Sequence, residues 1–443
     1  MSDLVTRRVL SAAAVRGPLL FIRGAARARL GEIVAIRCGG DERRGQVIEV
    51  GEDLAAIQVL EETRGIAPDR TEVELSGEVA TLAVSREMLG RTFDGTGQPT
   101  DGFPPPIPEA LLPVQGAAMN IVRREKPSEF IETGISAIDG LNTLVRGQKL
   151  PIFSCAGLPA ARLAAQIVRQ ARVRGGEPFA VVFAAVGAPF RESNEYLESF
   201  AESGTLDRTV VFLNRADDPP IERLLTPRCA LTCAEHLAFR HGMHVLVVLT
   251  DMTAYCEALR EVALAREELP GRRGYPGYLY TDLASIFERA GRLSGRPGSV
   301  TQLPVLTMPD DDLTHPIPDL SGYITEGQIV LSRELHQKGI FPPVDVLPSL
   351  SRLMQRGIGA GHTREDHRAV ADLLYRHYAK GRDLRRLEAI VGREGMTAGD
   401  RLMLDFATAF ESGLVNQREE RRDIGASLDA GIALLRRFNL EGR

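Results

Sequence analysis

Between residues 130 and 345 the sequence alternates short apolar runs with segments of helical pattern. Residues 245–249 are apolar at every position and lie between helical patterns at 221–240 and 254–268. Such runs are typical of strands buried on both faces, and helices are the usual connections of a parallel sheet. We therefore predict an α/β domain with a parallel sheet. The same pattern predicts strands at 149–153, 179–185 and 209–213 and helices at 160–173 and 192–201.

The N-terminal part has a different pattern. Four β-like runs separated by glycines lie about ten residues apart, at 19–22, 32–36, 46–50 and 72–75. This spacing predicts a small barrel or sandwich. The proline-rich residues 103–108 are predicted to form a stiff connection at the surface.

From about residue 360 the pattern becomes helical. Two pairs, Thr363 with Asp366 and Thr397 with Asp400, have the spacing of helix N-terminal caps. Apolar side chains recur at helical spacing, at positions 402, 404, 406 and 410 and again at 432, 434, 435 and 438. We predict three domains: a β-barrel at 1–75, an α/β domain at 76–350 and a helical domain at 351–443.

The predicted strand at 149–153 leads through residues 154–161 into a helix, which is where a phosphate-binding loop lies in nucleotide-binding domains. The chain has four lysines, none of which follows a glycine, so the motif G-x-x-x-x-G-K-[ST] is absent. Ala160 and Ala161 stand where a lysine and a hydroxyl would be needed. We predict a degenerate loop that acts as a structural turn. Weak anion binding near Arg162 is the alternative.

Asp251 follows the apolar run 245–249 and has two interpretations. It is positioned to hold magnesium through water or to cap the next helix. Without a phosphate loop we favour the cap. The turn at 186–190 also contains no carboxylate that would orient an attacking water.

Three further groups of residues are charged or are of types that bind metals. His236, His241 and His244 do not have the spacing of a known zinc motif, and no cysteine or carboxylate set accompanies them, so we predict no metal site. Asp310, Asp311 and Asp312 are interpreted as a solvated acidic loop rather than a cation site. Arg272 and Arg273 lie among glycines and are candidates for a phosphate contact or for a loop that faces a neighbouring subunit.

Composition excludes other classes of protein. The net charge is −5, which argues against a nucleic-acid binder. The sequence contains no run of eighteen apolar residues, so we predict no membrane span. The five cysteines form no CxxC pair, so we expect a reducing, cytoplasmic compartment.

Six long strings resemble one protein family. They are TGISAIDG at 133–140, GQKLPIF at 147–153, PGRRGYPGY at 270–278, THPIPDL at 314–320, YITEGQI at 323–329 and DVLPSLSRLM at 345–354. Together they resemble the non-catalytic B subunit of V-type rotary ATPases, and the similarity covers nearly the whole chain.

The resemblance implies an N-terminal β-barrel, a central RecA-like nucleotide-binding domain and a C-terminal helical domain. It also implies a ring of three catalytic A subunits alternating with three B subunits, with central-stalk and peripheral-stalk subunits as further partners. Such a complex lies on the cytoplasmic face of a membrane and touches the membrane only through its ion-translocating sector. It couples ATP synthesis or hydrolysis to proton or sodium transport.

Arg352 is the residue to which the resemblance gives a role. In the family an arginine here reaches the nucleotide phosphates of the neighbouring A subunit, so ATP or ADP would bind at the interface and the A subunit would hold Mg²⁺. A guanidinium group suits this task because it is permanently charged and contacts two phosphate oxygens at once. Ser351 and Tyr323 are predicted to line the same interface, with packing as the alternative for each.

Two other functions were weighed. A self-sufficient ATPase of related fold, such as a secretion-system motor, is opposed by the missing phosphate-loop lysine. A ring-shaped RNA translocase is opposed by the same absence and by the acidic charge balance. The prediction is therefore a subunit that is no enzyme by itself.

Overall fold

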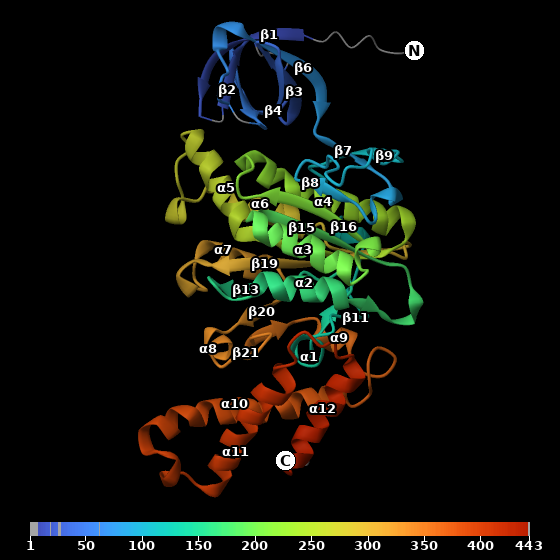
Figure 1. Cartoon of the computed structure of the whole chain (residues 1–443), viewed down its shortest axis with the longest axis vertical. Coiled ribbons are helices and arrows are strands. Elements are labelled where there is room, and N and C mark those ends of the chain that lie inside the picture. The colour runs from blue at the N-terminus through green and yellow to red at the C-terminus, as the bar shows by residue number, and fades with distance from the viewer. Residues whose placement is uncertain (1–7, 18, 25–27, 62, 442–443) are drawn as a thin grey trace.

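The computed structural model describes residues 8–17, 19–24, 28–61 and 63–441, and three parts follow one another along the long axis of the molecule (Figure 1). A barrel lies at one end, a sheet with helices forms the middle, and helices form the other end. Residues 1–7 and 442–443 of the predicted first and last domains lie outside the described residues.

The N-terminal part is a closed barrel with the strand order β1-β2-β5-β4-β3-β6. This decides between the barrel and the sandwich that the sequence left open. Along β3, side chains alternate between the barrel core and the surface, as expected for a strand with one buried face. Gly39 and Gly40 both have positive φ and form the two-residue turn between β3 and β4. The strands are β1 (Arg8–Arg16), β2 (Leu19–Arg23), β3 (Glu32–Cys38), β4 (Asp41–Val50), β5 (Leu54–Val59) and β6 (Thr71–Val79).

The middle of the molecule is built on a ten-stranded sheet whose main path is β21-β20-β13-β19-β17-β15-β16-β8. The pairings along its main path are parallel, with Val182 of β15 opposite Val247 of β17, except that β20 and β21 pair antiparallel at one edge; a short branch beside β19 is also antiparallel. The principal strands are β8 (Thr92–Asp94), β13 (Ile152–Cys155), β15 (Phe179–Ala188), β16 (Thr209–Arg215), β17 (His244–Thr250), β19 (Ser299–Met308), β20 (Gly327–Leu331) and β21 (Val344–Ser351).

Helices cover both faces of this sheet. The chain moves in one direction across the sheet through α2 and α3 and returns through α4 and α5. Because parallel crossovers are right-handed, the two pairs lie on opposite faces. The prediction of a covered parallel sheet is confirmed. The helices are α2 (Ala160–Gln170), α3 (Phe190–Glu202), α4 (Pro220–His241), α5 (Met252–Ala265), α6 (Leu279–Phe287) and α7 (Pro316–Ile324).

Two predicted elements have different bounds in the structure. The strand predicted at 149–153 becomes regular only at Ile152, because Pro151 has no N–H to donate to the ladder. The helix predicted at 160–173 ends at Gln170, because residues 172–173 form the short strand β14 beside β11. The smaller elements are β7 (Thr81–Val84), β9 (Ala110–Pro113), β10 (Arg124–Glu125), β11 (Phe130–Glu132), α1 (Ser136–Asp139), β12 (Leu144–Val145), β14 (Arg172–Val173), β18 (Gly291–Leu293), α8 (Arg333–Gln337) and α9 (Met354–Gly357).

The C-terminal part consists of α10 (His367–Val391), α11 (Ala398–Ala409) and α12 (Ile424–Arg437). Thr397 caps α11 as predicted, since its side chain accepts a hydrogen bond from the Asp400 N–H. The cap predicted at Thr363 is wrong. The helix begins at His367, and the Thr363 hydroxyl instead accepts a hydrogen bond from the Gly359 N–H.

Candidate functional site

Arg352 directly follows β21, the strand at one edge of the central sheet. Its backbone N–H donates a 3.0 Å hydrogen bond to the carbonyl of Glu326. The same carbonyl accepts a 3.2 Å hydrogen bond from the Gln148 side chain. The backbone at Arg352 is therefore held against the segment before β20.

A buried lysine supports this segment through ion pairs with two partly exposed carboxylates. The Lys149 side chain is 3% exposed, and its Nζ lies 3.0 Å from Oε1 of Glu326 and 2.7 Å from Oε1 of Glu288. The Lys149 N–H also donates to Oε2 of Glu326 at 2.8 Å. Burial acts to raise the pKa of Glu288, but Lys149 and Arg124 lower it overall, so the carboxylate stays charged. Lys149, Glu326 and Glu288 are called the Lys149 cluster below.

The Arg352 guanidinium group is exposed. Its Nη1 donates a 3.0 Å hydrogen bond to the carbonyl of Thr325. Within residues 63–441 no carboxylate lies within ion-pair distance of it. Several other exposed arginines are paired: Arg272 with Asp319 at 3.0 Å, Arg273 with Asp312 at 2.8 Å and Arg333 with Asp311 at 2.9 Å. Arg352 is thus fixed at its base and keeps N–H groups free for an external anion.

Tyr323 and Ser351 differ in their surroundings. Tyr323, on α7, is 74% exposed, three residues before the Glu326 carbonyl that holds Arg352. Ser351 is 7% exposed. Its hydroxyl donates to the Thr143 carbonyl at 2.8 Å and accepts from the Gln148 side chain at 2.9 Å. Ser351 therefore packs inside the chain, while Tyr323 remains on the surface.

A separate cavity of about 250 Å³ lies at the position of the phosphate loop, at the ends of the parallel strands. No lysine or arginine lines it, and it contains two acidic side chains, Asp251 and Glu192. Glu192 lies just beyond the turn at 186–190 and accepts a 2.6 Å hydrogen bond from the hydroxyl of Tyr196. This carboxylate lies outside the turn at 186–190, and α3 begins at Phe190, two residues earlier than predicted, so that Glu192 lines the cavity from its first turn. The lining is unsuited to a triphosphate.

Cations near this loop are already engaged. Arg162, the nearest cation in sequence, stacks on the Phe341 ring at 4.2 Å and pairs with Glu419 of the C-terminal part. Arg333 donates to the Ala156 carbonyl at 3.0 Å while it pairs with Asp311. The geometry favours the predicted structural turn over the anion-binding alternative.

Asp251 is the N-terminal cap of α5, as favoured from the sequence. One carboxylate oxygen accepts from the Thr253 N–H at 2.7 Å and from the Thr307 N–H at 3.3 Å. Burial raises the pKa of Asp251, while the hydrogen bonds from Thr307 and Thr253 lower it. One oxygen of Asp251 therefore accepts hydrogen bonds from backbone N–H groups of both α5 and β19.

The charged loops named from the sequence pair with one another at the surface. Asp310 and Asp311 are exposed, as predicted for a solvated acidic loop, and Asp311 and Asp312 also pair with arginines. Arg272 and Arg273 each form an ion pair with an aspartate, which does not favour a phosphate contact. His236 and His241 lie together at the end of α4, whereas His244 lies on β17 beside Arg146 and Ser299.

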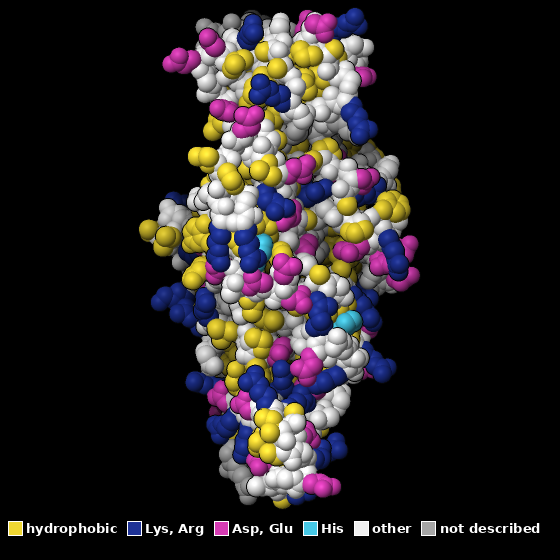
Figure 2. All heavy atoms as spheres, turned by 90° about the vertical axis from the view of Figure 1, so that its left-hand side faces the viewer, with side chains coloured by type: hydrophobic (Ala, Val, Ile, Leu, Met, Phe, Trp, Pro, Cys, Tyr) yellow, Lys and Arg dark blue, Asp and Glu magenta, His cyan; other side chains and the backbone are white. Residues whose placement is uncertain are grey.

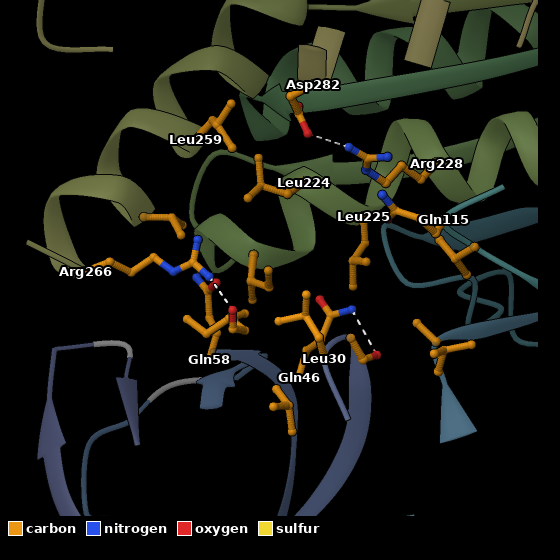
Figure 3. Close-up of a pocket in the computed structure, with 18 of the residues that line it drawn as sticks. Leu30, Gln46, Gln58, Gln115, Leu224, Leu225, Arg228, Leu259, Arg266 and Asp282 are labelled. Atoms are coloured by element: carbon orange, nitrogen blue, oxygen red, sulfur yellow. Dashed lines mark hydrogen bonds and ion pairs between the residues drawn. The ribbon is translucent and has the colours of Figure 1, made fainter. Parts of the chain in front are cut away.

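A cavity of about 560 Å³ lies between the barrel and the middle part (Figure 3). Leu30, Gln46 and Gln58 line it from the barrel side. Its polar groups on the other side are paired: Arg228 lies 2.7 Å from Asp282, and Arg266 donates to the Ile48 carbonyl at 2.7 Å. We interpret it as the joint between the two parts, and no residue of the Lys149 cluster lines it.

Comparison with known families assigns all three parts. Residues 13–77 match the beta-barrel domain of the ATP synthase alpha/beta family, and residues 134–351 match its nucleotide-binding domain. Residues 356–441 match the C-terminal domain of V and A type ATP synthase.

Comparison with individual proteins is more specific. A V-type ATP synthase beta chain of Anaeromyxobacter sp. (strain Fw109-5) is 72% identical over 434 residues, which cover 98% of this chain and 94% of that protein. The chain belongs to the V-type ATP synthase beta chain family. Another beta chain, from Thermus thermophilus, is 59% identical over 442 residues, covering 98% of this chain and 92% of its own length. The resemblance found in the sequence is confirmed.

The fold of this beta chain also matches a solved structure. The ATP synthase subunit NeqB from Nanoarchaeum equitans superposes with a TM-score of 0.77 at 40% identity, covering 95% of this chain and 99% of NeqB.

Proposed function

We propose that this beta chain is the non-catalytic, regulatory B subunit of a V/A-type ATPase or ATP synthase. It alternates with catalytic A subunits in a ring of three plus three and supplies Arg352 to the ATP site of its neighbour. The ring couples ATP synthesis or hydrolysis to the transport of protons or sodium.

The observation that carries this proposal is the state of Arg352. Its backbone is fixed by the Glu326 carbonyl, yet its guanidinium group is exposed and has no carboxylate partner among the described residues. Phosphoryl transfer builds negative charge on the equatorial oxygens, and an arginine supplied from a neighbour stabilises it. ATP or ADP would bind between the two chains, with Mg²⁺ held by the A subunit. Tyr323 is retained as a candidate because its side chain is exposed, whereas Ser351 is not retained, because it is buried.

The cavity at this chain's own loop supports the non-catalytic role. It has no cationic lining residue, and its two acidic side chains would repel phosphate. A chain with this loop would depend on its partner for chemistry.

The proposed partners are the catalytic A subunit and the subunits of the central and peripheral stalks. The complex would lie on the cytoplasmic side of a membrane and reach the bilayer through its ion-translocating sector. None of the helices in the described part of this chain is long and apolar enough to cross a bilayer. On the face shown in Figure 2, basic and acidic side chains are interspersed, which does not favour a nucleic-acid partner.

Substitution of Arg352 tests the proposal in the assembled complex. Arg352→Ala is expected to lower ATP turnover by roughly 10³-fold or more, the contribution typical of an arginine supplied in trans. Arg352→Lys keeps the charge but loses the planar guanidinium fork, so it is expected to recover only a small part of the lost ATP turnover. Steady-state ATPase assays of the purified complex measure both.

The matched control is Arg401→Ala, which removes an exposed arginine on α11. This variant is expected to leave turnover unchanged. Circular dichroism and gel filtration must show that all variants fold and assemble. Normal turnover in an assembled Arg352→Ala complex would contradict the proposed role.

A further inference from the structure

Two histidines and one carboxylate meet at the surface of the middle part, away from Arg352. His236 and His241 lie in the last two turns of α4. Glu109 lies in the segment between the proline-rich connection and β9. Glu109 is distant from both histidines in the chain, so no sequence spacing relates the three residues. The three residues are called the Glu109 triad below.

The potential ligand atoms of the Glu109 triad form a small triangle. Oε2 of Glu109 lies 3.1 Å from Nε2 of His236 and 2.9 Å from Nε2 of His241, and the two Nε2 atoms are 3.3 Å apart. Zinc binds histidine nitrogen and carboxylate oxygen at about 2.0–2.2 Å in tetrahedral geometry, so two such ligands lie about 3.3 Å apart. The triangle therefore matches one face of a zinc tetrahedron.

The carboxylate is held in the orientation that this geometry needs. Its second oxygen, Oε1, accepts a 2.9 Å hydrogen bond from the Arg86 N–H and lies 3.5 Å from the Ser85 hydroxyl. Oε2 is thereby directed at both imidazoles. Metal ligands are commonly oriented by such outer hydrogen bonds.

The histidines also suit a cation. The C-terminal end of α4 carries a partial negative charge. Arg240 opposes it with a nearby positive charge. The side chains are exposed by 6% at His236, 20% at His241 and 37% at Glu109, so one side of the triangle is open to solvent.

We propose that Glu109, His236 and His241 bind one divalent transition-metal ion such as Zn²⁺, with water in the fourth position. Imidazole nitrogen favours zinc, cobalt and nickel over magnesium, so the site is distinct in chemistry from any Mg²⁺–nucleotide site. The ion would clip the segment that follows the proline-rich connection to the end of α4. This proposal departs from the prediction made from the sequence, which was of no metal site.

Cobalt titration of the full chain tests this site without any partner subunit or ATP. Chain stripped with a chelator is expected to bind one Co²⁺ with the intense visible absorption of tetrahedral coordination, and Zn²⁺ is expected to displace it. A tenfold excess of Mg²⁺ should leave the spectrum unchanged. A thiolate charge-transfer band would reveal binding at the partly exposed Cys38 instead, and it would count against the proposal.

Two variants and a control locate the binding. Loss of a residue that only orients a metal ligand weakens metal binding by ~10–100-fold. His241→Ala and Glu109→Gln each remove a proposed ligand, so we expect a larger loss of Co²⁺ affinity. Both positions lie at the surface, and circular dichroism checks that each variant folds. His336→Ala removes an exposed histidine on α8 and should bind as the wild type does. The proposal is overturned if stripped wild type shows no tetrahedral spectrum, or if both triad variants keep full affinity. In that case the triad is a hydrogen-bonded cluster only.

Discussion

At the scale of single residues, neighbours in sequence have opposite surroundings. Ser351 is the last residue of β21 and packs inside the chain, whereas Arg352 lies in the turn that follows the strand and is exposed. The resemblance grouped the two residues, and no local pattern in the sequence separated them. Glu109 also carried no local signal, because no periodicity relates it to the histidines of α4.

Asp251 gives a prediction at this scale. Asp251→Asn is expected to leave turnover of the complex nearly unchanged, because asparagine is also a good helix cap and burial already disfavours the charged carboxylate. Asp251→Ala should lower stability by about 1 kcal/mol through loss of the cap. Thermal unfolding and ATPase assays measure the two effects. If a stable Asp251→Asn variant lost as much ATP turnover as Arg352→Ala does, Asp251 would be a catalytic carboxylate.

At the scale of elements, the central strands and helices were predicted well because their apolar runs are continuous. The errors have local causes. Pro151 delays β13, and the pairing of β14 with β11 ends α2 early. The Thr363 cap failed because a short polar side chain also satisfies nearby loop donors, here Gly359. The predicted domain boundaries at 75/76 and 350/351 remain predictions.

The Lys149 cluster links elements and predicts a coupling. Lys149→Met removes the buried ammonium and leaves Glu326 uncompensated, whereas Glu288 keeps Arg124 at 2.9 Å. We expect the free energy of unfolding to fall by about 3 kcal/mol, because a charge is left without its partner. ATP turnover of the complex should also fall, because the Glu326 carbonyl holds the Arg352 backbone.

The double variant Lys149→Met/Glu326→Gln serves as the control for this prediction. Removing the unpaired charge should recover much of the stability, so the two effects should not add. Urea unfolding of the four proteins in the cycle measures the coupling. Strictly additive losses would show that the ion pair does not support this segment.

At the scale of the whole molecule, the barrel, sheet and helices form the order that family membership leads one to expect. Contacts join the parts. Arg266 holds the barrel through the Ile48 carbonyl, and Arg162 and Arg169 bind Glu419 of the C-terminal part. These links between distant residues were not predictable from local patterns, since each joins segments far apart in sequence.

Assembly gives the prediction at this scale. The isolated chain should show no ATPase activity, because its own loop has no phosphate-binding cation. Mixed with the A subunit from the same genome, it should co-purify and give activity above that of either protein alone. Pull-down followed by an ATPase assay measures this. Absence of both association and activity would mean that this beta chain has a role different from its relatives.

The closed barrel has a consequence for how subunits meet. Among the described residues, closure pairs each of the strands β1–β6 with two neighbours, so the barrel that they form has no unpaired edge strand. A neighbour is therefore unable to extend the barrel by strand addition, and the same closure protects against edge-to-edge aggregation. Specificity at this end has to come from loops and outward side chains, which can change by substitution without altering the strand framework.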